Sequence, residues 1–253
     1  MGKTIAVMNF KGGVGKTTTS VNLAAALSRL RYKVLVVDVD SQRNATIILD
    51  RDRDCDDTIY STICATGSPA LPVYEHDRGF DFVPGDKRLK DIDIILSNRL
   101  AKEKILAKAL KPVIGEYDFI IIDCPPNAGT MTVNAMVAAD SLLIPVDSQP
   151  MALDGLNDIL VLWREVVEQE LNPTLQIEGF LLTRYRQNYA TCRAVQSTLQ
   201  EIHADTLLYT RIRENTTLGQ APGARQTIYE YEPRCAGAED YLALAHELIN
   251  KNK

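Results

Sequence analysis

A short apolar run from Thr4 to Asn9 leads directly into a segment rich in glycine and lysine, and then into a helical pattern. The segment reads Lys11-Gly-Gly-Val-Gly-Lys-Thr-Thr18, and the apolar residues after it recur at helical spacing. Consecutive small residues let backbone N–H groups curl around phosphate oxygens, and a helix N-terminus adds positive potential. This order of strand, loop and helix predicts a phosphate-binding loop for a nucleotide, although Phe10 stands where the strict GxxxxGK[ST] pattern has its first glycine.

The side chains in and near this loop are those that magnesium–nucleotide chemistry needs. Lys16 can reach the β- and γ-phosphates, and the Thr17 hydroxyl can ligate Mg²⁺. Asp123 ends one apolar run of strand length, and Asp38 and Asp40 follow another. A lone aspartate at a strand end is more often a turn or cap residue. Because ligands gather at the carboxyl ends of strands in an open parallel sheet, we nevertheless expect these carboxylates beside the loop.

Apolar runs of strand length alternate with helical patterns along the rest of the chain. This alternation is typical of βαβ units and of a parallel sheet with helices on both faces. We therefore expect a three-layer α/β fold of the P-loop NTPase type, with a central, mostly parallel sheet, in a single domain over residues 1–253. Besides the helix after the loop, the expected strands are 4–9, 34–38, 80–83, 119–123, 142–146 and 177–182, and the expected helices are 58–65, 97–111, 130–139, 153–169, 189–202 and 237–250.

Residues 50–90 are polar and rich in turn-forming residues. We expect an excursion from the sheet here that carries only the helix 58–65 and the strand 80–83. The acidic cluster from Asp50 to Asp57 lies at its start. Because runs of charge usually face water, we interpret this cluster as a solvated loop rather than a metal site.

The composition fits an ordinary globular protein and excludes several other classes. The 253 residues are 45% hydrophobic with a formal net charge of −5, which is unlike disordered, collagen-like or disulfide-scaffold proteins. The sequence contains no apolar run of about 18 residues, so we expect no transmembrane helix, and the N-terminus lacks the features of a signal peptide. Five cysteines without a CxxC pair argue against a disulfide framework or a zinc site. We therefore expect a cytoplasmic protein. Because the net charge is negative, binding to nucleic acid would need a local basic patch.

Motifs in a fixed order along nearly the whole chain resemble the ParA/MinD family of ATPases. The segment Lys11–Thr18, with its second, upstream lysine, is similar to the deviant Walker A motif of that family. The stretch Asp38–Thr46 resembles DxDPQxNAT, and Asp123 ends a segment that resembles the Walker B strand. Further similarities lie at Ala152–Leu156, which resembles ALEGL, and at Ala221–Ile228, which resembles APSxGxTI. The set is more similar to the ParA subgroup, which acts in partition and positioning, than to MinD.

The resemblance implies roles for the matching positions. Lys16 and the loop backbone would hold the β- and γ-phosphates of ATP, Thr17 would bind Mg²⁺, and Asp123 would order the water around the ion. Asp40 would orient or activate the attacking water. Lys11 matches the family's signature lysine, which reaches across an ATP-bound dimer to the partner's phosphates and so couples hydrolysis to dimerisation. The implied catalytic residues are Lys11, Lys16 and Asp40, the nucleotide-binding residues are Lys11, Gly12, Gly13, Val14, Gly15, Lys16, Thr17, Thr18 and Asn215, and the metal-binding residues are Thr17, Asp40 and Asp123.

Four positions, Phe10, Ser41, Arg213 and Glu214, depart from the family pattern. Ser41 replaces a proline, a change that a turn tolerates, and Phe10 replaces the common Gln or Gly without a functional explanation. The segment Ile212-Arg-Glu-Asn215 stands where the family usually has IPRN. Asn215 matches and is expected at the adenine end of the pocket, whereas Glu214 replaces an arginine that the family uses toward DNA.

The C-terminal half has a modest basic bias. Residues 184–234 contain seven arginines against five acidic residues, a local charge of +2. Non-specific binding to duplex DNA depends on phosphate contacts rather than net charge, and a dimer doubles any basic patch. With the resemblance, this predicts DNA contacts from Arg184, Arg186, Arg211 and Arg213. The alternative is that these arginines are ordinary solvated surface or helix-end charges.

The resemblance as a whole implies a slow, Mg²⁺-dependent ATPase that forms an ATP-dependent homodimer. The dimer would bind double-stranded DNA non-specifically on the nucleoid, and a ParB-like adaptor on a plasmid, chromosome or other cargo would stimulate hydrolysis. The last helix reads as a packed helix rather than a basic amphipathic membrane anchor, so no membrane partner is expected.

Two other classes stay open. A metal-cluster carrier or reductase-type ATPase would need paired cysteines at the dimer interface, and only Cys124 lies near the predicted site. A P-loop metabolic ligase would turn over ATP in response to a small substrate rather than DNA or a protein partner.

Overall fold

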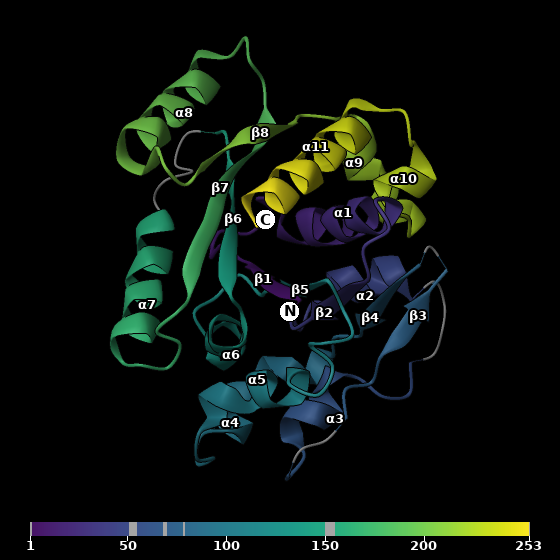
Figure 1. Ribbon diagram of the computed structural model, residues 1–253, viewed down its shortest axis with the longest axis vertical. Coiled ribbons are helices and arrows are strands. Elements are labelled where there is room, and N and C mark those ends of the chain that lie inside the picture. The colour runs from purple at the N-terminus through teal and green to yellow at the C-terminus, as the bar shows by residue number, and fades with distance from the viewer. Residues whose placement is uncertain (1, 51–54, 68–69, 78, 150–154, 253) are drawn as a thin grey trace.

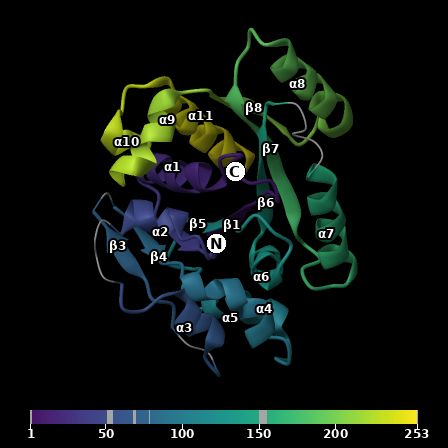
Figure 2. The same ribbon diagram turned by 180° about the vertical axis from the view of Figure 1, so that it is seen from behind.

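A mostly parallel β-sheet forms the centre of the molecule, with helices on both of its faces (Figure 1; Figure 2). The computed structural model describes residues 2–50, 55–67, 70–77, 79–149 and 155–252. Within these residues the strand order is β3-β4-β2-β5-β1-β6-β7-β8, and each neighbouring pair is parallel except β3 with β4. The strands are β1 (Lys3–Val7), β2 (Val34–Asp38), β3 (Tyr74–His76), β4 (Phe80–Val83), β5 (Phe119–Asp123), β6 (Ser141–Asp147), β7 (Gln176–Tyr185) and β8 (Leu207–Arg213).

The helices divide into two layers that bury opposite faces of the sheet. One layer, which contains the first and last helices, is formed by α1 (Lys16–Arg29), α2 (Asn44–Leu49), α9 (Thr216–Gln220), α10 (Ile228–Tyr231) and α11 (Ala236–Lys251). The other is formed by α3 (Ile59–Cys64), α4 (Ile92–Ile95), α5 (Ile105–Leu110), α6 (Thr130–Ala138), α7 (Leu156–Glu168) and α8 (Ala190–His203). The expected three-layer α/β fold is therefore confirmed.

The central strands are apolar along their whole length because both of their faces are buried. In β5, Phe119 and Ile121 pack in the core beneath α1 and α11, whereas Ile120 and Ile122 pack in the core on the other face. This follows from the alternation of side chains along a strand. Complete burial of one such side chain stabilises the fold by about 1.5–3 kcal/mol. Because many such side chains are buried on both faces, the two cores fix the position of the central strands, whose ends carry the functional site.

The predicted helix 97–111 is wrong over its first half. Residues 97–101 form turns, a short 3₁₀ helix follows at Lys102–Lys104, and only Ile105–Leu110 is α-helical. Ala101 has a left-handed backbone with φ of 52°, which an α-helix cannot contain. The Arg99 guanidinium also donates to the carbonyls of Ile63 and Ala65, which ties this segment to the end of α3.

The sequence pattern also misses several short elements. Besides the expected helix and strand, residues 50–90 contain β3, which pairs antiparallel with β4. The edge strand β8 is missed because polar residues interrupt its apolar ones. Two of its N–H groups donate hydrogen bonds to a side chain in place of a further strand. The amides of Tyr209 and Thr210 donate to the two carboxylate oxygens of Glu247 on α11, at 2.7 and 2.8 Å. Within the acidic cluster, residues 51–54 lie outside the described residues.

A close approach between β7 and β8 gives a stability test of this edge. A Cβ atom on Gly179 would lie 2.6 Å from Leu208 Cγ, whereas one on Gly115 would meet nothing within 4 Å. We expect Gly179→Ala to lower the free energy of unfolding by about 1–3 kcal/mol through overpacking, and Gly115→Ala to change it little. Urea unfolding followed by circular dichroism checks this, and equal midpoints for the two variants would contradict the close packing of β8.

Candidate functional site

The glycine-rich loop joins β1 to α1 at the carboxyl edge of the sheet. Gly13 and Gly15 have φ of 74° and 91°, a left-handed conformation that glycine adopts without steric cost. Gly15 caps α1, whose first turn contains no acidic residue and receives no side-chain cap. The positive end of this helix is therefore not neutralised by its own side chains, as a phosphate site requires.

Two cavities adjoin the loop and share Gly13, Gly15 and Thr18. The first has a volume of about 560 Å³, and the second has a volume of about 290 Å³. Of the residues predicted to bind nucleotide or metal, Gly12, Gly13, Gly15, Lys16, Thr17, Thr18 and Asp40 line the first cavity, and Gly13, Val14, Gly15, Thr18 and Asn215 line the second. Asn215 also caps α9, where its side-chain oxygen accepts a hydrogen bond from the Thr217 amide.

Lys11 does not line either cavity, although its backbone shapes the loop. Its amide donates to the Asn9 side chain at 2.9 Å, and its carbonyl accepts a hydrogen bond from Lys16 Nζ at 3.1 Å. Lys16 is itself buried. The two lysines of the motif therefore occupy different environments: Lys16 turns back into the loop, and Lys11 lies outside the cavity walls.

Asp123 joins the end of β5 to the first turn of α1. Thr17 Oγ1 donates to one of its carboxylate oxygens and Ser20 Oγ donates to the other, both at 2.8 Å. Thr17 and Ser20 lie three residues apart on one face of the helix, so both can reach the same strand end. Thr17 and Asp123 were predicted from the sequence. Ser20 was not, although its helical spacing from Thr17 is a signal that could have revealed it.

Asp38 and Asp40 lie beside this junction at the end of β2. Asp38 accepts hydrogen bonds from the Asp40 amide and from both the amide and hydroxyl of Thr46, the last at 2.7 Å. Asp40 accepts a hydrogen bond from the Gln42 amide, and its side chain lines the first cavity. Asp38 thus holds the turn, which leaves Asp40 at the cavity wall.

Burial shifts the protonation of these groups. Burial raises the pKa of Asp123 to about 7, with the nearby Asp38 charge adding to the shift, and burial raises the pKa of Asp38 to about 6. Burial also lowers the pKa of Lys16, against the opposing charge of Asp123. The described residues bring more carboxylates than cations to this edge, and a bound cation would balance that charge.

The donor set fits Mg²⁺, which prefers oxygen ligands and usually keeps several waters beside one or two protein ligands and substrate phosphates. The Thr17 hydroxyl and the Asp123 carboxylate already lie in hydrogen-bond contact. Within the described ranges no three His, Cys, Asp or Glu side chains form a closed metal cage. This arrangement suits an ion held jointly by protein, water and phosphate.

The four arginines predicted to contact DNA all have partners within the protein. Arg184 contacts Asp147 at 2.8 Å, Arg186 pairs with Glu214, and Arg211 lies 5.0 Å over the Tyr185 ring. Arg213 contacts Asp240 at 2.7 Å and Glu239 at 3.0 Å, contacts that raise the pKa of its guanidinium. The structure brings three of them, Arg186, Arg211 and Arg213, to the ends of β7 and β8, and turns Arg184 toward the phosphate loop.

The strand order and the loop with its paired Thr17 and Asp123 define a P-loop nucleotide-binding protein. A family model described as "AAA domain" matches residues 2–177. The sporulation initiation inhibitor protein Soj of Bacillus subtilis is 39% identical over 251 residues, which cover 98% of each chain. The chromosome partitioning protein ParA of Myxococcus xanthus is 37% identical over all of this chain and 89% of its own length. The chain therefore belongs to the ParA/MinD family of ATPases.

A solved structure shares this fold. Cobyrinic acid a,c-diamide synthase from Mycobacterium smegmatis, with bound ADP and magnesium, is 28% identical and superimposes with a TM-score of 0.83 over 99% of this chain and 95% of its own. Among the described residues of the present protein, no helix is long and apolar enough to cross a membrane.

The raised pKa of Asp123 makes a pH-dependent prediction about stability. The pKa of Asp123 is about 7 in the folded chain against an ordinary value of 3.8, so protonated Asp123 stabilises the nucleotide-free fold. That contribution is complete below pH 4 and is lost as the pH rises through 7. Asp123→Asn mimics the protonated form, and we expect its advantage in unfolding free energy over wild type to grow from pH 5 to pH 8 by on the order of 2 kcal/mol.

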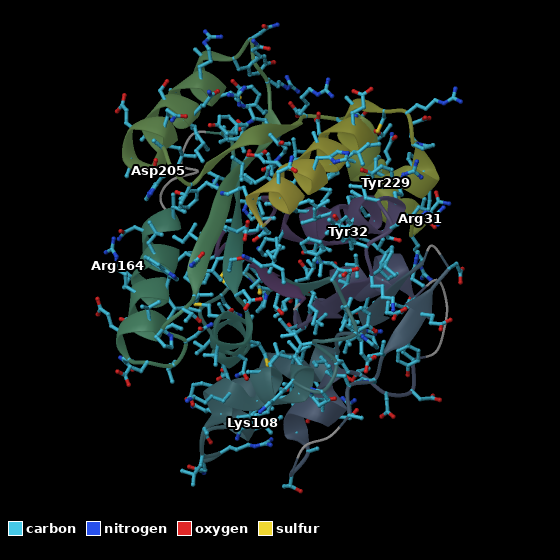
Figure 3. All side chains as sticks on the ribbon, in the orientation of Figure 1. Arg31, Tyr32, Lys108, Arg164, Asp205 and Tyr229 are labelled. Atoms are coloured by element: carbon cyan, nitrogen blue, oxygen red, sulfur yellow. The ribbon has the colours of Figure 1, made fainter. Side chains whose placement is uncertain are left out.

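Urea unfolding in EDTA without nucleotide, at pH 5 and pH 8, measures this difference. Asp205→Asn, on an exposed turn far from the loop (Figure 3), controls for the removal of one surface carboxylate. An Asp123→Asn advantage that stays constant between the two pH values would show that Asp123 is already ionised in the fold at pH 5.

Proposed function

We propose that this protein is a slow, Mg²⁺-dependent ATPase whose ATP-bound homodimer binds double-stranded DNA non-specifically. A ParB-like adaptor on a plasmid, chromosome or other cargo would stimulate hydrolysis and so drive partition or positioning over the nucleoid in the cytoplasm. The observation that carries the proposal is the two-lysine loop joined to Asp123 through Thr17. The names of the relatives, Soj and chromosome partitioning protein ParA, support the partition role.

The chain's own residues divide the work of ATP hydrolysis. Lys16 and the loop amides would hold the β- and γ-phosphates over the first cavity, with Thr18 toward the α-phosphate and Asn215 at the base in the second cavity. Thr17 and Asp123 would hold Mg²⁺, which neutralises phosphate charge when bound. Asp40, at the cavity wall, would orient the attacking water. Phosphoryl transfer needs mainly this kind of positioning and charge neutralisation.

Lys11 would complete the site from the partner subunit. Its position outside the walls of both cavities is what a residue that acts on the partner's phosphates requires. A site that lacks one cation until two subunits meet hydrolyses ATP only as a dimer. We assign the whole chain, residues 1–253, to this ATPase domain, because α11 near the C-terminus packs on α1, with Tyr241 Oη 3.3 Å from Thr19 Oγ1.

Two observations bear on the alternative classes. Cys124 is buried, with its thiol against the Ile122 carbonyl, which is unlike an interface ligand of a metal-cluster carrier. The similarity to a diamide synthase favours a P-loop metabolic ligase as the second candidate. A ligase would show ATP turnover that rises with a small carboxylic acid and amino donor, and not with DNA or an adaptor.

The signature lysine gives the sharpest test of catalysis in trans. We expect Lys11→Ala to lower ATP turnover on the order of 100-fold or more, because a cation supplied to the transition state is lost. Its affinity for ATP should stay near that of wild type, since Lys11 lines neither cavity. Lys16→Ala is the matched control and should lose binding itself. Phosphate release measures ATP turnover, and calorimetry measures ATP affinity. Turnover at the wild-type rate by Lys11→Ala would contradict the proposal that Lys11 acts on ATP held by the partner subunit.

DNA binding is tested by comparing the protein with ADP, with ATP, and with ATP plus Asp40→Ala. We expect binding only in the ATP states, strongest in the variant that cannot complete hydrolysis. If about four phosphates are neutralised, the affinity should fall about 100-fold between 50 and 200 mM salt. Fluorescence anisotropy with a labelled duplex measures it. Absence of binding in every state would leave the ATPase and replace DNA with a protein partner.

A charge variant asks whether Arg186 takes part. Because Arg186 pairs with Glu214, we expect Glu214→Gln to release the arginine and strengthen DNA binding several-fold. Glu201→Gln, which neutralises an exposed acid on α8, is the matched control for net charge. Equal gains in the two variants would indicate a general charge effect and no specific contact from Arg186.

A further inference from the structure

Two residues at the carboxyl end of β7 donate hydrogen bonds to two consecutive carbonyl groups of the phosphate loop. Arg184 donates from its guanidinium to the Gly13 carbonyl. Thr183, the preceding residue, donates from its hydroxyl to the Val14 carbonyl at 2.9 Å. Both contacts join positions about 170 residues apart in the chain, so they depend on the register of the finished sheet.

These contacts fix the direction in which the loop amides point. No cis peptide occurs among the described residues, and in a trans peptide the C=O and N–H groups point in opposite directions. With the carbonyls of Gly13 and Val14 turned toward β7, the N–H groups of the same two peptides, those of Val14 and Gly15, point away from it. A phosphate site needs such N–H groups presented together. A glycine-rich segment would otherwise sample several orientations.

Asp147 holds Arg184 in place. This carboxylate ends β6, is 4% exposed, and contacts Arg184 Nη2 at 2.8 Å through Oδ2. Its other oxygen, Oδ1, accepts no hydrogen bond from the residues that the structure describes. A buried carboxylate that loses its cation is strongly destabilising. The ion pair therefore keeps the guanidinium in contact with the loop, while the Arg184 side chain is 48% exposed to solvent.

The backbone of Arg184 shows that this position is imposed. Its φ of 49° is left-handed, a conformation that a residue with a long side chain rarely adopts and that the surrounding contacts must maintain. Arg184 directly follows Thr183, and Thr183 of β7 is paired with Asp147 of β6 in the sheet. The strand end, the ion pair and the loop contact thus form one continuous unit.

We propose that Arg184 is a positioning residue for nucleotide binding, which Asp147 locks in place so that the Val14 and Gly15 amides are preset to receive the β-phosphate. The proposal deepens the proposed ATPase function and rests on it. It assigns Arg184 to the nucleotide site rather than to the DNA surface, and it makes Asp147, which no motif identified, part of the same device.

The test is a thermodynamic cycle on ADP and non-hydrolysable ATP binding by calorimetry. We expect Arg184→Ala to weaken both ligands by the same factor, about tenfold, because both carry a β-phosphate. Asp147→Asn should weaken them several-fold, and the double variant should bind no worse than Arg184→Ala, since the two residues act through one contact. Arg164→Ala, which removes an arginine that points outward from α7 (Figure 3), is the matched control and should bind as wild type does.

Amide NMR of the nucleotide-free protein separates positioning from general destabilisation. In Arg184→Ala we expect shifted or broadened amide resonances at Val14 and Gly15, with unchanged resonances in β1 and β5. If Arg184→Ala fails to fold, Arg184→Lys and Asp147→Asn take its place in both measurements, because each keeps most of the packing.

The outcomes separate this proposal from the function on which it rests. If wild type binds neither nucleotide, both fail. If wild type binds and the Arg184 and Asp147 variants bind within twofold of it, only the positioning role fails. Loss of DNA binding by Arg184→Ala at unchanged nucleotide affinity would also overturn it, in favour of a DNA contact.

Discussion

The pairing of β5 with both β1 and β2 determines where all the chemistry of this protein lies. In the parallel register Asp123 is opposite Val7 on one side and Asp38 on the other. The last residue of β5 therefore lies between the start of the phosphate loop and the turn that carries Asp40. A shift of one residue would exchange Phe119 and Ile121 with Ile120 and Ile122 between the two faces, so the close packing of both hydrophobic cores holds this register. The accuracy of the site is a consequence of packing on both sides of one strand.

This register has an electrostatic cost that protonation or a bound cation lowers. It brings the carboxylates of Asp38 and Asp123 side by side in the interior. Burial is the main cause that raises both pKa values, with the Asp38 charge adding to the shift of Asp123 and the Asp40 charge adding to that of Asp38. Lys16, whose own pKa is lowered by burial, offsets part of this charge. Sites of this kind are stabilised by what they bind, since a ligand that prefers the folded state adds its binding free energy to stability. The fold is thus arranged to be most stable with a cation and phosphates in place.

Much of this could be predicted from sequence because the signals are local. The strands 34–38 and 119–123 were predicted with their observed bounds, since nearly continuous apolar runs define them. Lys16, Thr17 and Asp123 follow from residue type and position relative to a strand. The helix 97–111 was overestimated because the Arg99 contacts to α3 are tertiary. The hydrogen bond from Arg184 to the loop was not predictable, because it depends on the register of β6 and β7 and on a backbone conformation that no residue pattern encodes.

The part of the chain that follows β8 packs on α1, the helix that begins in the loop. On α1, Asn22 accepts a hydrogen bond from the Ile228 amide at 2.7 Å, and Thr19 lies in hydrogen-bond contact with Tyr241 of α11. Asp240, beside that tyrosine, binds both the backbone amide and the side chain of Arg213 at the end of β8. Packed side chains and hydrogen bonds of this kind can transmit a change at one end of a helix to the surface at the other. The phosphate loop and Arg213 at the end of β8 are therefore linked by a continuous set of packed side chains and hydrogen bonds through α1 and α11.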